Sequence, residues 1–160
     1  MPGKPIKRNE NIIPLSRDHH LGLLFCWKIR QGLNNKIEFS RIRKYILYFW
    51  ESHLKQHFAE EESLLFNQIE DTLCEDALYQ HKQIRNIITN LTASTLQEEE
   101  TYSLLASLTD KHIRFEERIL FPHLESVLSN EVLSSIGTQL KMIHSELKED
   151  VYSDEFWLKN

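Results

Sequence analysis

Two stretches of the chain, HFAEEESLLFN (residues 57–67) and HIRFEERILFP (residues 112–122), share one pattern. Each begins with a histidine, passes three spacers to a Glu-Glu pair, and reaches Leu-Phe after two further spacers. Residues four positions apart on an α-helix lie about 40° apart in projection, so the histidine and the first glutamate of each copy face the same way. Both copies therefore place an imidazole and a carboxylate one turn apart on one helix face.

The repeat indicates a site to which two helices each bring one imidazole and one carboxylate. The ligands it predicts are His57 and Glu61 in the first copy, and His112 and Glu116 in the second. Such ligands suit iron, manganese or zinc, and a pair of ions fits the twofold pattern. The alternative is that each copy is only the solvated acidic face of an amphipathic helix. A second copy with the same spacing favours the metal site.

Composition limits the class of protein. With 160 residues, 41% of them hydrophobic, and only 4 Gly and 4 Pro, the chain predicts one domain built from long helices. A formal charge of -5 argues against nucleic acid as a partner. The sequence contains neither an apolar run of about 18 residues nor a signal-peptide core, so we expect no membrane span and a cytoplasmic location. Cys26 and Cys74 stand alone and are expected to be buried, reduced residues.

Periodicity and breaker residues predict five helices, at about residues 16–32, 40–70, 72–91, 98–121 and 131–150. Pro122 is expected to end or kink the fourth of them. Short connections favour antiparallel neighbours, so the predicted fold is all-α: an up-down-up-down four-helix bundle with an additional C-terminal helix.

The expected organisation along the chain has three parts. An irregular N-terminal arm covers residues 1–14, and the four-helix bundle covers residues 15–126. A C-terminal helix and tail, residues 127–160, are expected to pack on the bundle, and Phe156 and Trp157 are the aromatic residues of that tail.

If the first and third helices match as the second and fourth do, each should supply one histidine. The third helix carries His81 among aliphatic residues, and the first carries His19 and His20. His19 has a leucine one turn before it and another one turn after it, so periodicity favours His19 as the ligand. His20 aligns with Leu24 and Trp27 and could equally face inward.

The order of these residues resembles the hemerythrin-like family, the HHE cation-binding domains, over about residues 12–125. Single histidines on the first and third helices and His-x-x-x-Glu on the second and fourth carry the resemblance. It implies an antiparallel four-helix bundle with a non-haem di-iron centre of two iron ions, for which manganese or zinc are possible substitutes. The ligands it implies, with both glutamates bridging, are His19 or His20, His57, Glu61, His81, His112 and Glu116.

The chain departs from the oxygen-carrying members at two positions. They have a second histidine one turn after the third-helix histidine, where this chain has Arg85, so one iron is expected to keep an exchangeable position. The alternative is that Arg85 points to solvent beside glutamates of a neighbouring helix and that another group, such as His53, completes the ligand set. The carriers also place the fourth-helix carboxylate five residues after its histidine. That makes Glu117 the alternative to Glu116.

The resemblance implies a protein that binds or senses O₂ or NO or handles iron, with O₂, NO or small anions as partners at the metal site. We expect it not to be an enzyme. The first alternative is a di-iron oxidase or a peroxide- or NO-consuming enzyme, in which Arg85 would orient an anionic intermediate. The second is a helical interaction module with a degenerate metal site. His123 and His144 lie outside the repeat and are expected to be surface or packing residues.

Overall fold

The computed structural model describes residues 7–93, 98–144 and 149–158, and every regular element in these ranges is helical. The longer helices, in chain order, are α1 (Ile13–Asn34), α2 (Phe39–Phe49), α3 (Lys55–Glu60), α4 (Thr72–Ala93), α5 (Glu99–Phe115), α6 (Phe121–Val127) and α7 (Asn130–Ile143). Shorter pieces are the 3₁₀ turn Glu10–Ile12 and the π-helical turns Trp50–Leu54, Glu61–Leu65 and Glu116–Leu120.

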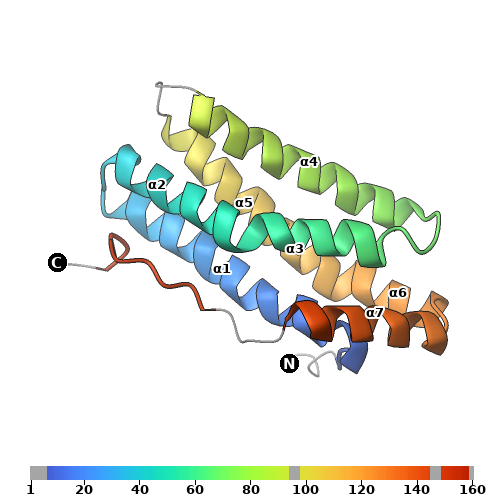
Figure 1. Cartoon of the computed structure of the whole chain (residues 1–160). Coiled ribbons are helices and arrows are strands. Elements are labelled where there is room, and N and C mark those ends of the chain that lie inside the picture. The colour runs from blue at the N-terminus through green and yellow to red at the C-terminus, as the bar shows by residue number, and fades with distance from the viewer. Residues whose placement is uncertain (1–6, 94–97, 145–148, 159–160) are drawn as a thin grey trace, which may run out of the picture.

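Four helical rods form an antiparallel bundle, with the chain reversing direction at each connection (Figure 1). The rods are α1, α2 with α3, α4, and α5 with α6. Helix α1 packs along α5, α4 packs on α5, and α2 contacts both α1 and α4. Helix α7 lies across one end of the bundle against the 3₁₀ turn (Figure 1). The predicted all-α bundle with an additional C-terminal helix is confirmed.

The turn from α1 to α2 is closed by a Schellman motif. The Ile37 N–H donates to the carbonyl of Gly32 at 2.9 Å, and the Lys36 N–H donates to the carbonyl of Leu33 at 3.1 Å. This motif needs a left-handed residue, and Lys36 supplies it with φ 53°. Glycine occupies that position most readily, so a lysine there carries a conformational cost.

Of the two outcomes expected for Pro122, an end or a kink of the fourth rod, the structure shows no end. The rod continues through α6 to Val127, because the π-helical turn Glu116–Leu120 precedes the proline. The Phe121 N–H bonds to the carbonyl of Glu116, five residues back. Pro122 thus lies in the first turn of a new α-helical segment, where its missing N–H breaks no ladder bond.

Two apolar clusters fill the bundle interior. One lies around Phe25, Phe49 and Leu105, and the other around Leu15, Leu65 and Leu120. On every rod the candidate ligand histidine lies between a residue of the first cluster and a residue of the second. The polar residues of the repeat therefore form a layer between two hydrophobic cores.

The described part of the C-terminal segment contacts α1 and α2. Phe156 and Trp157 are 2% and 8% exposed and join the first apolar cluster. Asp150 accepts from Lys28 Nζ at 2.8 Å and from the Tyr45 hydroxyl at 2.5 Å. Parts of the predicted arm, polar link and last helix, at residues 1–6, 94–97 and 145–148, lie outside the described residues. No helix in the described part is long and apolar enough to cross a membrane.

Candidate metal centre

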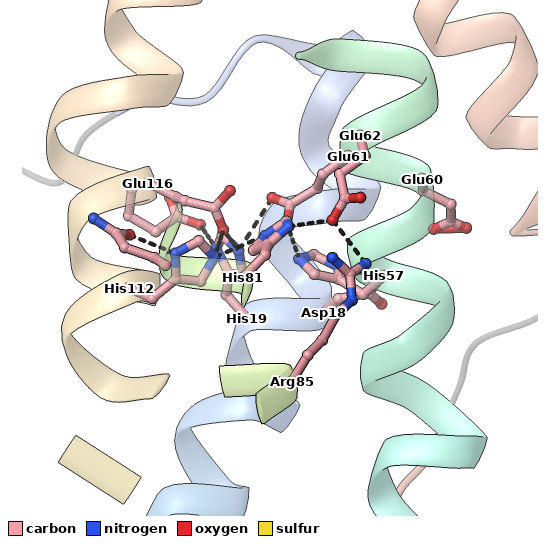
Figure 2. A network of polar contacts seen from close by, with 12 residues as sticks. Asp18, His19, His57, Glu60, Glu61, Glu62, His81, Arg85, His112 and Glu116 are labelled. Carbon is pink, nitrogen blue, oxygen red and sulfur yellow. Dashed lines mark hydrogen bonds and ion pairs between the residues drawn. The ribbon is translucent and has the colours of Figure 1, made fainter. Parts of the chain in front are cut away.

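Four histidines from four different rods converge in the polar layer between the two cores. His19 comes from α1, His57 from α3, His81 from α4 and His112 from α5. None is more than 5% exposed. Figure 2 shows their rings turned toward a common centre. The structure thus brings together the four histidines that the sequence singled out, with His19 as the contribution of the first helix.

Two glutamates, Glu61 and Glu116, lie among these rings with no exposed surface. Each is the first residue of a π-helical turn, a local widening of the helix that is frequent at functional sites. Each carboxylate lies between histidines of two rods. The contacts are Glu61 Oε1 to Nε2 of His57 (3.2 Å) and His81 (3.1 Å), and Glu116 Oε1 to Nε2 of His19 (3.0 Å) and His112 (3.0 Å).

These six residues make two groups of potential metal ligands that share both carboxylates. One group is His19, His57, Glu61 and Glu116, and the other is Glu61, His81, His112 and Glu116. Within each group the ligand atoms lie within 4.8 Å of one another. The two groups thus have both glutamates in common.

Several of the potential ligand atoms lack hydrogen-bond partners in the described part of the chain, and the distances between them suit coordination of a metal ion. Glu61 Oε2, Glu116 Oε2 and His57 Nε2 are buried without a hydrogen-bond partner among the described residues. Buried polar atoms are rarely left unpaired, because their lost hydration costs free energy. Donors about 2.1 Å from one ion and at right angles to each other would lie about 3.0 Å apart, close to the spacings seen here. The site therefore has the donor set and spacing of a cation site.

Each site histidine is also held at its other ring nitrogen, Nδ1. The partners at Nδ1 are Glu117 for His19 (2.7 Å), Asp18 for His57 (3.0 Å), Glu62 for His81 (2.6 Å) and Gln80 for His112 (2.6 Å). Such partners fix the ring orientation and tautomer, and so aim Nε2 at the centre. Arg85 extends one of these chains, because its guanidinium lies 2.7 Å from Glu62 Oε2.

The outer partners follow a rule that the sequence analysis missed. Every partner is the immediate sequence neighbour of a candidate ligand on a different rod from the histidine it holds. Asp18 precedes His19 yet holds His57, and Glu62 follows Glu61 yet holds His81. In the sequence, these partners appear only as polar residues next to the candidate ligands. The sequence does not indicate which neighbouring helix each of them contacts.

The pKa values of the buried site residues are shifted by burial and by their contacts with one another. Burial alone lowers the pKa of His19, but hydrogen bonds to Glu116 and Glu117 outweigh it and raise that pKa to about 9. Burial and the nearby charge of Glu116 raise the pKa of Glu61 well above its usual value. Burial also acts to raise the pKa of Glu116, but His112 and the hydrogen bonds it accepts lower it well below normal.

Two alternatives for ligands lie elsewhere. His20, kept open beside His19, is exposed and lines a shallow surface groove with Leu23, Leu24 and Trp27. The reason is packing: α1 turns the His19 side of the helix toward α5, and the next residue points about 100° away. Glu117 contacts His19 at Nδ1, away from the centre.

Arg85 and His53 also lie away from the Nε2 centre. Arg85 is paired with Glu62 of a neighbouring rod and is not among the residues that line the small cavity beside the centre. His53 lines that cavity but belongs to neither ligand group. The donors divide evenly, with two histidines in each group.

The small cavity adjoins one side of the centre and has a volume of about 20 Å³. His57, Thr109 and Glu116 are among its polar lining, and Phe49, Leu54 and Ile113 are among its apolar lining. Gly22 leaves room here, since a Cβ atom on it would lie 2.6 Å from Ile113 Cδ1. A cavity of this size holds about one small molecule.

The fold and the site together define a helical-bundle metal-binding protein. The chain belongs to the hemerythrin family: the family profile, described as hemerythrin HHE cation binding domain, matches residues 15–124 and also residues 78–159. The second match agrees with the internal repeat, because each half of the bundle carries a single histidine followed by His-x-x-x-Glu. No curated protein and no solved structure matches the chain.

Proposed function

We propose that the protein holds two iron ions, one in each ligand group, and that Glu61 and Glu116, which belong to both groups, would contribute ligands to both ions. The observation that carries the proposal is the pair of ligand groups that share both carboxylates. Four imidazoles and two carboxylates, without thiolate, suit iron and admit manganese or zinc as substitutes. Two ionised carboxylates would offset the repulsion between two cations held close together.

The residues of the chain prepare this centre in three ways. The carboxylates sit in a layer from which water is excluded by apolar clusters on both sides. The outer partners hold each imidazole by Nδ1 so that Nε2 faces inward. When bound, the iron pair would supply open positions for a small ligand and exchange electrons with it.

The ligand class follows from the cavity beside the centre. Its volume of about 20 Å³ suits a ligand of the size of O₂, NO or a small anion. Thr109 Oγ1 is buried in its wall without a hydrogen-bond partner among the described residues, and is a candidate donor to the ligand. We therefore propose O₂ or NO binding, sensing or iron handling as the function, in the cytoplasm that the sequence predicts. Consumption of peroxide or NO is the alternative that a turnover assay separates.

Iron loading tests the proposal. The metal-free protein, incubated anaerobically with Fe²⁺ and desalted, should retain about two iron ions per chain. Glu61→Ala should lose most of this iron, while Glu62→Ala, which removes only an outer partner, should keep more of it. Addition of NO should change the absorption spectrum of the iron-loaded wild type but not that of Glu61→Ala. Retention of less than about one metal ion by a folded wild type would refute the proposal.

A further inference from the structure

The small cavity beside the centre is lined in part by a hydroxyl residue that belongs to neither ligand group. Thr109 on α5 has no exposed surface, and its Oγ1 is buried without a hydrogen-bond partner among the described residues. Buried polar groups are nearly always hydrogen-bonded, because an unpaired one has lost its hydration without replacement. We therefore expect the partner of this hydroxyl to be a molecule that enters the cavity.

The hydroxyl of Thr109 also lacks the bond that helical threonines commonly make within their own helix. Such a hydroxyl can donate to the backbone carbonyl four residues earlier. The Thr92 hydroxyl lies 3.3 Å from the Ile88 carbonyl in this way, and the Thr138 hydroxyl lies 3.0 Å from the Ser134 carbonyl. Thr109 lies inside α5 but makes no such bond. Its hydroxyl thus stays available to a ligand.

The internal repeat indicates that packing does not require a hydroxyl at this position. Thr109 precedes His112 by three residues, and the residue three before His57 in the first copy is Leu54. Leu54 is also buried and lines the same cavity. The two copies therefore place an apolar and a polar side chain at matching positions. Of the two, only the threonine can donate a hydrogen bond.

The position of Thr109 on α5 puts it beside the paired site. Thr109, His112 and Glu116 follow one another at spacings of three and four residues, so they share one helix face, and all three line the cavity. The ring nitrogens of His112 are already engaged, Nδ1 with Gln80 at 2.6 Å and Nε2 with Glu116 at 3.0 Å. The threonine hydroxyl is therefore a donor on this face that no contact within the site uses.

We propose that the Thr109 hydroxyl donates a hydrogen bond to a small anion held at the paired metal site, an inference that rests on the proposed function. A hydrogen bond to a charged acceptor is shorter and stronger than one to a neutral acceptor. Thr109 thereby narrows the ligand class. Of O₂, NO and small anions, it favours a ligand that carries negative charge on the atom facing α5.

Two substitutions separate the hydroxyl from the size of the side chain. Thr109→Val keeps the branched shape and removes the hydroxyl, whereas Thr109→Ser keeps the hydroxyl and removes a methyl group. Azide is the probe, added to the iron-loaded protein and followed by absorption. Its dissociation constant should rise about tenfold or more in Thr109→Val, as the loss of a hydrogen bond to a charged group predicts, and less than about threefold in Thr109→Ser.

Three azide results would overturn the inference. They are equal affinity in wild type and Thr109→Val, an equal loss in both variants, and no azide binding by the iron-loaded wild type. Thr138→Val is the remote control, because it removes a hydroxyl that bonds within α7, and it should bind azide as wild type does. If Thr109→Val does not fold, Thr109→Ala takes its place, since it differs from Thr109→Ser only by the hydroxyl.

The metal-free protein provides a measurement that does not depend on iron. Thr109→Val should not lower its Tm, because no hydrogen bond to a described residue is lost. A fall of about 2 °C or more would show that the hydroxyl bonds within the protein, and would overturn the inference.

Iron content separates this inference from the proposed function. Thr109 belongs to neither ligand group, so each Thr109 variant should retain as much iron as wild type. Retained iron with an azide affinity that Thr109→Val does not change would overturn the inference alone. Retention of less than about one iron ion by a folded wild type would refute the proposed function and, with it, the anion site.

Discussion

At the scale of single residues, neighbours in the sequence have separate tasks. In each Glu-Glu pair the first carboxylate lies among the Nε2 atoms and the second holds a histidine at Nδ1. The difference follows from the helix, where one position rotates the side chain by about 100°. Glu61 and Glu116 are fully buried, whereas the side chains of Glu62 and Glu117 are 28% and 29% exposed.

The second Glu-Glu pair provides a prediction. Glu116→Ala should abolish binding of at least one iron ion, because it removes an oxygen common to both ligand groups. Glu117→Ala should retain iron with an affinity lower by about 10- to 100-fold, as expected for an outer partner. Competition with a chelator of known affinity measures both. Loss of iron from Glu117→Ala with full binding by Glu116→Ala would show that the five-residue spacing of the oxygen carriers applies here.

At the scale of elements, the positive φ of Lys36 in the α1–α2 turn lowers the stability of the fold. Lys36→Gly should raise the free energy of unfolding by about 1 kcal/mol, because glycine adopts the positive φ of the Schellman motif without strain. For a chain of this length that corresponds to about 2–4 °C in Tm. Lys36 is exposed, so Lys36→Ala, which keeps the strained φ, is the control and should change stability little. Equal stabilisation by both variants would contradict the conformational explanation.

The C-terminal segment provides a second test at this scale. The ion pair of Asp150 with Lys28 is buried, with side chains 3% and 9% exposed. Asp150→Ala should destabilise the protein by about 3 kcal/mol, because it leaves the ammonium of Lys28 buried without its counter-ion. Asp154→Ala is the matched control: its pair with Arg41 has side chains 36% and 42% exposed, and its loss should cost less than about 1 kcal/mol. Urea unfolding compares the two variants. Equal losses of stability would contradict the conclusion that burial makes the Asp150–Lys28 pair the more important one.

At the scale of the whole molecule, the bundle is two hydrophobic cores separated by a layer of polar residues. Apolar packing holds the rods together at both ends, while the layer between them contains carboxylates and imidazoles that are costly to bury. Metal ions in this layer would supply positive charge that balances the two buried carboxylates. Metal binding should therefore stabilise the entire fold rather than one helix.

The pH dependence of the metal-free protein tests this balance. The pKa of His19 is raised from 6.5 to about 9, so its contribution to stability is complete below pH 6.5 and is lost as the pH rises through about 9. Urea unfolding of the metal-free protein should show this fall, and His19→Gln should show a smaller one. Zinc affinity should change in the opposite direction and rise over the same window, because the metal displaces the proton from His19. Increased stability of the metal-free protein toward pH 9 would contradict the prediction.

Local pattern in the sequence is sufficient for the fold class and for much of the candidate site. Apolar periodicity and the scarcity of Gly and Pro predict the long helices, and the repeated His-x-x-x-Glu places a ligand pair on one helix face. These inferences depend only on the geometry of a single helix, so they can be made without knowing how the helices pack. His81 was also identified this way, as a lone imidazole on an apolar stripe.

Only the tertiary structure decides how the helices are rotated against one another. That rotation turns His19 inward and His20 outward. It also brings Asp18 into contact with His57 of another helix, which the sequence does not indicate. It also brings His144 to Glu60, 84 positions away. Helical periodicity fixes the angle between successive side chains of one helix at about 100° per residue. The rotation of that helix about its own axis is decided by packing against its neighbours. The sequence therefore determined the ligand types and their spacing, and the packing of the bundle determined which of them meet.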